Sequence, residues 1–195
     1  MEYRLNKKTL LEKLGEWNSF LRRKISLIAC GGTALTLLDV KASTKDVDFM
    51  VPKEADYRYL IKTLKNLGYR QITGSGWART GDVYIFDLFA GNRIHTTELF
   101  ESPLKSKNHI LLKEFSRLYI GILNYYDLIS SKLFRGTGVD FEDCLMLVEA
   151  RHDEIDINYL TGHFKKLASY DVSEDRLFKN LDYFLLLLKE KNLHG

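Results

Sequence analysis

Cysteine and proline are scarce in this chain of 195 residues, which contains two of each. Cys30 and Cys144 stand far apart and form no C-x-x-C pair, so neither a zinc site nor a redox motif of that kind is indicated. A fold stapled by disulfides is excluded as well, and a reducing, cytoplasmic location fits this composition best.

Long hydrophobic runs are missing too. The longest near the C-terminus, residues 183–188, is far shorter than the roughly 20 residues that cross a bilayer. Residues 1–14 mix charges with leucine and lack the apolar core of a signal peptide, so we expect neither secretion nor a membrane partner. The net charge of +3 is too small to identify a nucleic-acid partner. The 45% apolar and 28% charged residues are typical of a globular protein.

Helix and strand patterns alternate in the first part of the chain. Apolar residues at helical spacing predict a helix over residues 6–23. A buried strand at 26–30 stops at a Gly-Gly turn, and a brief helix at 33–38 follows. Further strands are predicted at 46–51, 69–73, 83–89, 109–112 and 117–123, with a helix at 54–67.

Only helix patterns follow residue 124. They predict an α+β fold, in which a twisted mixed sheet with helices on one face precedes a small C-terminal helical bundle. We therefore expect a catalytic part at 1–123 and a helical part at 124–195 that packs on it. The predicted helices of the second part are 125–135, 141–151, 157–168 and 174–191.

The most informative segment joins the Gly-Gly turn to a strand that contains two aspartates. Gly31–Gly32 would let backbone N–H groups approach a polyphosphate, and the Thr33 hydroxyl would add a contact. Asp46 and Asp48 alternate with apolar residues, so both carboxylates leave the same face of the strand. Mg²⁺ binds through one or two carboxylates together with substrate phosphates, which predicts a magnesium site for one or two ions here.

Asp87 is a lone acid within an otherwise apolar predicted strand. If that strand lies beside the one with the two aspartates, Asp87 would be a third metal ligand and would orient or deprotonate an attacking hydroxyl. The alternative is a structural acid paired with Arg79 or Arg93.

These residues resemble the nucleotidyltransferase superfamily, which has the DNA polymerase beta-like fold. In that superfamily a Gly-Gly or Gly-Ser turn precedes an Asp-x-Asp strand, and a later strand supplies a third acid. Gly31–Gly32, Asp46, Asp48 and Asp87 match these features. Within the superfamily, GGTALTLL with TKDVDF is most similar to a small uncharacterised branch related to AbiEii-type toxins.

A second segment, YYDLISSKLFRGTGVDFEDCLMLV, resembles a lysine-containing helix followed by an Asp-rich helix start in that branch. Lys132 and Arg135 would share one helix face and hold the triphosphate, although a solvated helix face is an equal alternative. Asp140 at an N-cap and Asp143 at the third helical position would be either functional or simple helix caps.

The resemblance implies a metal-dependent enzyme that transfers a nucleoside monophosphate from a nucleoside triphosphate, such as ATP, to a hydroxyl group and releases pyrophosphate. The acceptor would be tRNA, a protein or a small molecule. A role as a toxin, with an antitoxin protein as partner, is also implied. The alternative is a noncatalytic nucleotide-binding or partner-binding module that retains the fold.

Three other features are interpreted as structural. The glycines of residues 74–81 precede a strand and do not open a helix, so they predict a hairpin. Cys30 and His152 have no recognisable catalytic partners and are not expected to act as nucleophiles.

Overall fold

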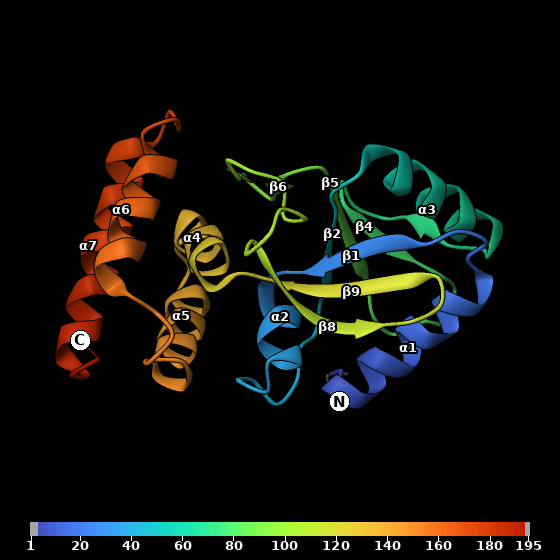
Figure 1. The fold of residues 1–195 in the computed structure, drawn as a ribbon, viewed down its shortest axis with the longest axis horizontal. Coiled ribbons are helices and arrows are strands. Elements are labelled where there is room, and N and C mark those ends of the chain that lie inside the picture. The colour runs from blue at the N-terminus through green and yellow to red at the C-terminus, as the bar shows by residue number, and fades with distance from the viewer. Residues whose placement is uncertain (1–3, 194–195) are drawn as a thin grey trace.

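The computed structural model describes residues 4–193 and shows the predicted α+β fold (Figure 1). Residues 1–3 and 194–195, which belong to the predicted catalytic and helical parts, lie outside the described residues. The strands are β1 (Ile25–Ala29), β2 (Val47–Val51), β3 (Arg70–Gln71), β4 (Gly76–Ala78), β5 (Phe86–Ala90), β6 (Arg93–Ile94), β7 (Thr97–Glu98), β8 (His109–Glu114) and β9 (Leu118–Leu123). The helices are α1 (Lys7–Phe20), α2 (Gly31–Leu37), α3 (Glu54–Asn66), α4 (Tyr125–Arg135), α5 (Gly138–Ala150), α6 (Ile157–Ala168) and α7 (Glu174–Glu190).

Seven strands form one mixed sheet in the order β3-β4-β5-β2-β1-β9-β8, and β6 pairs with β7 in a separate hairpin. β1 is parallel to β9 and antiparallel to β2, whereas β2 is parallel to β5. The ends of β1 and β9 and the beginnings of β2 and β5 therefore meet at one edge of the sheet. Most of the predicted site residues follow or precede the strands at this edge.

Helices cover one face of the sheet. On that face the ring of Trp17 in α1 packs against Phe86 of β5, with ring centroids 4.2 Å apart. Trp77 is the register partner of Phe86, and the ammonium of Lys65 in α3 lies 5.6 Å from the Trp77 ring. Side chains alternate between faces along a strand, so Asp87, next to Phe86, points to the opposite face.

Capping residues set the ends of two C-terminal helices. The Asn124 side chain accepts a hydrogen bond from the backbone N–H of Asp127 at the start of α4, and Gly136 ends this helix with a φ of +66°. The Asp156 carboxylate accepts a hydrogen bond from the backbone N–H of Tyr159 at the start of α6. Both helices have the bounds predicted from the sequence.

Helices alone follow β9 in the described chain. α4 to α7 pack on one another, and α4 and α5 also contact α2. They form the bundle at the left of Figure 1, while α1 and α3 lie at the right. No helix within residues 4–193 is long and apolar enough to cross a membrane.

Several short elements differ from the prediction. β4 begins in the segment predicted as a turn, and the β6–β7 hairpin lies where no element was predicted. These strands have two or three residues, too few to show an alternating pattern. α2 begins at Gly31, so the two glycines open the helix and are not a separate turn before it. α5 begins at Gly138 because Thr137 caps it.

Candidate active site

Asp48 and Asp87 are direct neighbours on the parallel strands β2 and β5. Both side chains leave the face of the sheet that lies opposite α1 and α3. They line one cavity of about 300 Å³ at the edge of the sheet. Ser75 donates a hydrogen bond of 2.6 Å to Oδ1 of Asp87. The structural alternative for Asp87 is not observed, because Arg79 pairs with Asp82 and the Arg93 guanidinium donates to the carbonyl of His95.

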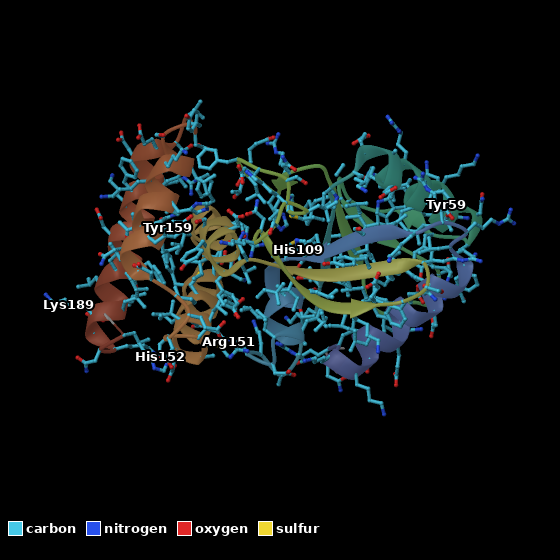
Figure 2. All side chains as sticks on the ribbon, in the orientation of Figure 1. Tyr59, His109, Arg151, His152, Tyr159 and Lys189 are labelled. Carbon is cyan, nitrogen blue, oxygen red and sulfur yellow. The ribbon has the colours of Figure 1, made fainter. Side chains whose placement is uncertain are left out.

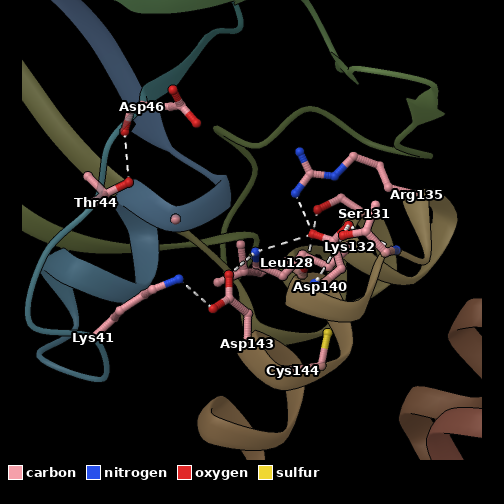
Figure 3. A network of polar contacts seen from close by, with 12 residues as sticks. Lys41, Thr44, Asp46, Leu128, Ser131, Lys132, Arg135, Asp140, Asp143 and Cys144 are labelled. Carbon is pink, nitrogen blue, oxygen red and sulfur yellow. Dashed lines mark hydrogen bonds and ion pairs between the residues drawn. The ribbon is translucent and has the colours of Figure 1, made fainter. Parts of the chain in front are cut away.

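Asp46 comes directly before β2, and its side chain is exposed at the mouth of the same cavity. Two threonines fix the position of its backbone carbonyl. The hydroxyls of Thr33 and Thr44 each donate a hydrogen bond of 2.9 Å to the Asp46 carbonyl. Figure 3 shows the bond from Thr44, with the Asp46 carboxylate directed away from it.

The fully buried Thr33 links the two aspartates of the Asp-x-Asp strand. Besides donating to the Asp46 carbonyl, its hydroxyl accepts a hydrogen bond of 2.9 Å from the backbone N–H of Asp48. The hydroxyl thus acts as both donor and acceptor toward the backbone, and Thr33 does not line the cavity. The hydroxyl therefore links α2 to the start of β2, and the contact of Thr33 with a phosphate stays a prediction.

The two glycines allow close contacts, each with a different neighbour. Gly31 has a φ of +56°, and a Cβ at this position would overlap the carboxylate of Asp48. A Cβ at Gly32 would lie 2.8 Å from Oγ1 of Thr44. Gly32 lines the cavity and Gly31 does not, so only Gly32 is placed to approach a ligand.

Burial is the main cause of an unusual pKa at Asp48, which is 7% exposed. Desolvation, followed by repulsion from Asp87 and Asp46, raises the pKa of the Asp48 carboxyl to about 7, against opposing effects of Arg135 and Lys132. Such a carboxylate is costly to ionise by itself and is stabilised by a nearby cation.

The three carboxylates are not gathered into a complete metal site. Within residues 4–193, no group of three His, Cys, Asp or Glu side chains is arranged to hold a metal ion. Like charges repel, which favours the separation of the exposed Asp46 from the other two acids. The donor chemistry nevertheless fits magnesium, because all three residues offer carboxylate oxygens to one cavity.

Cations from the helical part line the same cavity, and Figure 3 shows Lys132 and Arg135 across from Asp46. The ammonium of Lys132 in α4 is buried and lies 2.6 Å from Asp143 and 3.7 Å from Asp140. Arg135, one turn later, forms an ion pair with Asp140. The structure therefore does not show a solvated helix face at Lys132, and both cations line the same cavity as the aspartates of the sheet.

Asp140 and Asp143 have different positions from those predicted. Thr137 is the N-cap of α5, and Asp140 is the third helical residue, which completes a capping box with Thr137. Although burial opposes it, hydrogen bonds from Thr137 and Arg135 lower the pKa of Asp140 below its usual value. Asp143 lies farther along the helix and does not cap it, since its carboxylate binds Lys132 and Lys41.

His95 and Lys41 line the cavity but were not identified from the sequence. His95 lies at the tip of the β6–β7 hairpin with a φ of +50°, and its Nε2 lies 3.3 Å from the guanidinium of Arg135. Desolvation and Arg135 lower the pKa of this imidazole. No motif marked His95, whereas the short distance of Lys41 from Asp46 in the sequence was an available signal.

Cys30 and His152 do not line the cavity of the three aspartates. Cys30 is fully buried before α2, and burial raises the pKa of its thiol well above the usual value. His152 lies at the C-terminal end of α5 on the surface, 3.0 Å from Asp153 (Figure 2). The glycine-containing segment after β3 forms the predicted antiparallel hairpin with β4.

The chain matches the family model described as "Nucleotidyltransferase of unknown function (DUF6036)" over residues 9–190. No curated protein matches it significantly. JHP933 from Helicobacter pylori has 15% identity and a TM-score of 0.48, with 96% of this chain and 94% of that chain covered. TM1012 from Thermotoga maritima has 15% identity and a TM-score of 0.46, with coverages of 76% and 98%. ANT(2'')-Ia, in its complex with adenylyl-2''-tobramycin, has 13% identity and a TM-score of 0.42, with coverages of 90% and 92%.

Proposed function

This chain belongs to the family described as "Nucleotidyltransferase of unknown function (DUF6036)", and we propose that it transfers a nucleoside monophosphate from a triphosphate to an acceptor hydroxyl. One observation supports this proposal most directly. Asp48 and Asp87 lie in register on one face of the sheet and share a cavity with Lys132 and Arg135. Carboxylates for a metal ion and cations for phosphates are thus brought to the same cavity.

Asp46, Asp48 and Asp87 would hold one or two magnesium ions in this proposal. Bound magnesium would offset the charge of the triphosphate and polarise its phosphoryl oxygens. Asp46, with its exposed side chain, would turn toward Asp48 and Asp87 to complete the ligand set. Occupation of the site would also remove the electrostatic cost of ionising the buried Asp48.

The remaining residues would bind the nucleotide. Lys132 and Arg135 would neutralise charge on the β- and γ-phosphates, and the backbone at Gly32 would approach them closely. Gly31 and Thr33 would act by positioning Asp48 and the beginning of β2, the strand that contains it.

Asp87 is the proposed base for the acceptor. It would accept the proton of the acceptor hydroxyl as the hydroxyl oxygen forms a bond to the α-phosphorus. The bond between the α-phosphorus and the bridging oxygen of the β-phosphate breaks, and pyrophosphate leaves. Asp87 is less buried than Asp48 and receives a hydrogen bond from Ser75, which would orient its carboxylate.

The helical part, residues 124–195, is proposed to complete the active site, because Lys132 and Arg135 come from it. The division into parts 1–123 and 124–195 thus separates the acidic wall from much of the basic wall. A relationship to the AbiEii-type branch, a toxin role and a cytoplasmic location remain predictions from the sequence.

Two experiments test the proposed function. Thermal unfolding with magnesium and each nucleoside triphosphate asks whether nucleotides bind the folded protein, since such ligands raise its stability by mass action. Triphosphates that are radiolabelled at the α-phosphate are then incubated with total RNA, cell protein and small hydroxyl compounds. The acceptor is identified by the label that it gains. Stabilisation without transfer to any of these pools would instead favour a noncatalytic nucleotide-binding module.

A further inference from the structure

Asp143 connects two lysines that come from different parts of the chain. Its Oδ1 accepts a hydrogen bond of 2.7 Å from the ammonium of Lys41, and its Oδ2 accepts one of 2.6 Å from Lys132 (Figure 3). Lys41 belongs to the segment between α2 and β2, which also contains Asp46. Asp143 therefore joins the segment before the Asp-x-Asp strand to the C-terminal helices.

Burial makes this arrangement unusual. The side chains of Lys132 and Asp143 are 2% and 4% exposed, whereas that of Lys41 is 26% exposed and reaches the cavity. Desolvation of buried charges often cancels their mutual attraction, so an apolar cluster would stabilise the fold about as well. Stability alone is thus a weak reason for a buried carboxylate between two ammonium groups.

The charges alternate along this wall of the cavity. Lys41, Asp143, Lys132, Asp140 and Arg135 form successive ion pairs, with three cations and two anions. Each anion holds its neighbouring cations in place. This row has one more cation than anions, and all of its members except Asp140 line the same cavity as the three aspartates of the sheet, together with Arg4 and Lys45. The cavity thus offers carboxylates to a metal ion and cations to a polyphosphate, which is anionic along its whole length.

We propose that Lys41 binds the terminal phosphates of the nucleotide and that Asp143 is a positioning residue that holds Lys41 and Lys132 side by side for this contact. The inference rests on the proposed function, because it assumes that the cavity takes a nucleoside triphosphate. Lysine suits this role as a compact charge with three donors, so Lys41 keeps donors for a phosphate while one contacts Asp143.

Calorimetric binding of ATP and of AMP, both with magnesium, separates a contact with the terminal phosphates from a general effect. We expect Lys41→Gln to weaken ATP binding at least tenfold and to change AMP binding less than twofold, while Lys41→Arg retains most of the ATP affinity. Lys62→Gln is the matched control, because Lys62 is exposed on α3 over the other face of the sheet. ATP binding by Lys41→Gln within twofold of the wild type would overturn the assignment of Lys41.

The positioning role of Asp143 is tested by coupling. Asp143→Asn should weaken ATP binding. In the Asp143→Asn background, Lys41→Gln should then reduce the free energy of ATP binding by less than half as much as it does in the wild type, because the lysine is already displaced. Asp143→Glu, which keeps the charge, should restore part of the affinity and supplies a folded variant if Asp143→Asn unfolds. Fully additive effects would overturn the positioning role. Failure of the wild type to bind ATP would overturn the proposed function itself, a result distinct from unchanged binding by Lys41→Gln.

Discussion

Asp48 and Asp87 face each other across β2 and β5, although 38 residues lie between them in the sequence. Their side chains leave the sheet on the same side because parallel strands in register place partner residues on one face. Two acids so close together, one of them buried, are stabilised by a cation. This relationship is the basis for the expected effects of substitutions at the site.

Asp48→Asn should preserve the fold and abolish nucleotidyl transfer. The amide has the shape of the carboxylate but removes a negative charge from the proposed magnesium site, so activity should fall by about two orders of magnitude or more. Transfer to the identified acceptor would be compared at equal concentrations of folded protein over a range of magnesium. Comparable rates for both proteins would contradict a metal-binding role for Asp48.

The stability of the metal-free protein should depend on pH through Asp48. Its pKa is raised from 3.8 to about 7 on folding, so the folded state binds a proton more readily than the unfolded state between these values. The stabilising effect of that proton is complete below pH 4 and is lost as the pH rises through 7.

Relative to the wild type, Asp48→Asn should therefore gain stability between pH 5 and pH 8, by on the order of 2 kcal/mol. Urea unfolding in the presence of a chelator measures this difference, and the comparison cancels the contributions of other titrating groups. A difference that stays constant with pH would show that Asp48 titrates normally.

Gly31→Ala should destabilise the protein and disturb Asp48. The substitution places a Cβ on a residue with a φ of +56° and against the Asp48 carboxylate, so a loss of at least about 1 kcal/mol is expected. Gly138→Ala is the matched control, because a Cβ there meets no atom within 4 Å. Thermal unfolding of both variants checks this prediction, and equal stabilities would contradict it.

Gly32 requires a different interpretation from the sequence-based one. The sequence predicts that a larger side chain here would meet the phosphates, but in the structure its Cβ would also press on Thr44, which donates to the Asp46 carbonyl. Weaker nucleotide binding by Gly32→Val would thus combine both effects.

Thr33→Val should remove the acceptor of the buried backbone N–H of Asp48, whereas the Asp46 carbonyl loses one of its two donors and keeps the hydrogen bond from Thr44. The expected loss of stability is about 1–3 kcal/mol, with reduced transfer because Asp48 is no longer held in place. Thr33→Ser keeps the hydroxyl and should retain most of the activity. If Val and Ser behave alike in unfolding and transfer assays, the hydroxyl has no positioning role.

Local sequence signals accounted for most of the secondary structure. The helices at 125–135 and 157–168 were predicted to the residue, since their periodicity lies within the segments and their caps directly flank them. The strands of the β6–β7 hairpin were missed, because two residues carry no period and their pairing depends on contacts outside each strand.

The sequence by itself determined the family resemblance, the α+β class and the acids that define the candidate site. The spacing of Asp46 and Asp48 from the Gly-Gly pair is a property of the chain, whereas the shared face that strand alternation predicts for the two aspartates stays a prediction, because Asp46 lies before β2. Local rules suffice for such features, because neighbours in the sequence remain neighbours in space.

Only the tertiary structure decided that Lys41 lines the cavity with those acids, beside the predicted Lys132 and Arg135. Lys41 and Asp143 are 102 positions apart, and no sequence pattern marks their contact. Nor does a pattern show that the Thr33 hydroxyl is engaged by the backbone, or that Asp143 lies between two ammonium groups. The contact of Thr33 depends on how α2 packs against β2, and those of Asp143 depend on how α4 and α5 pack against α2. Such packing results from burial of apolar surface, which is not directional and leaves no periodic signal in the polar residues that it brings together.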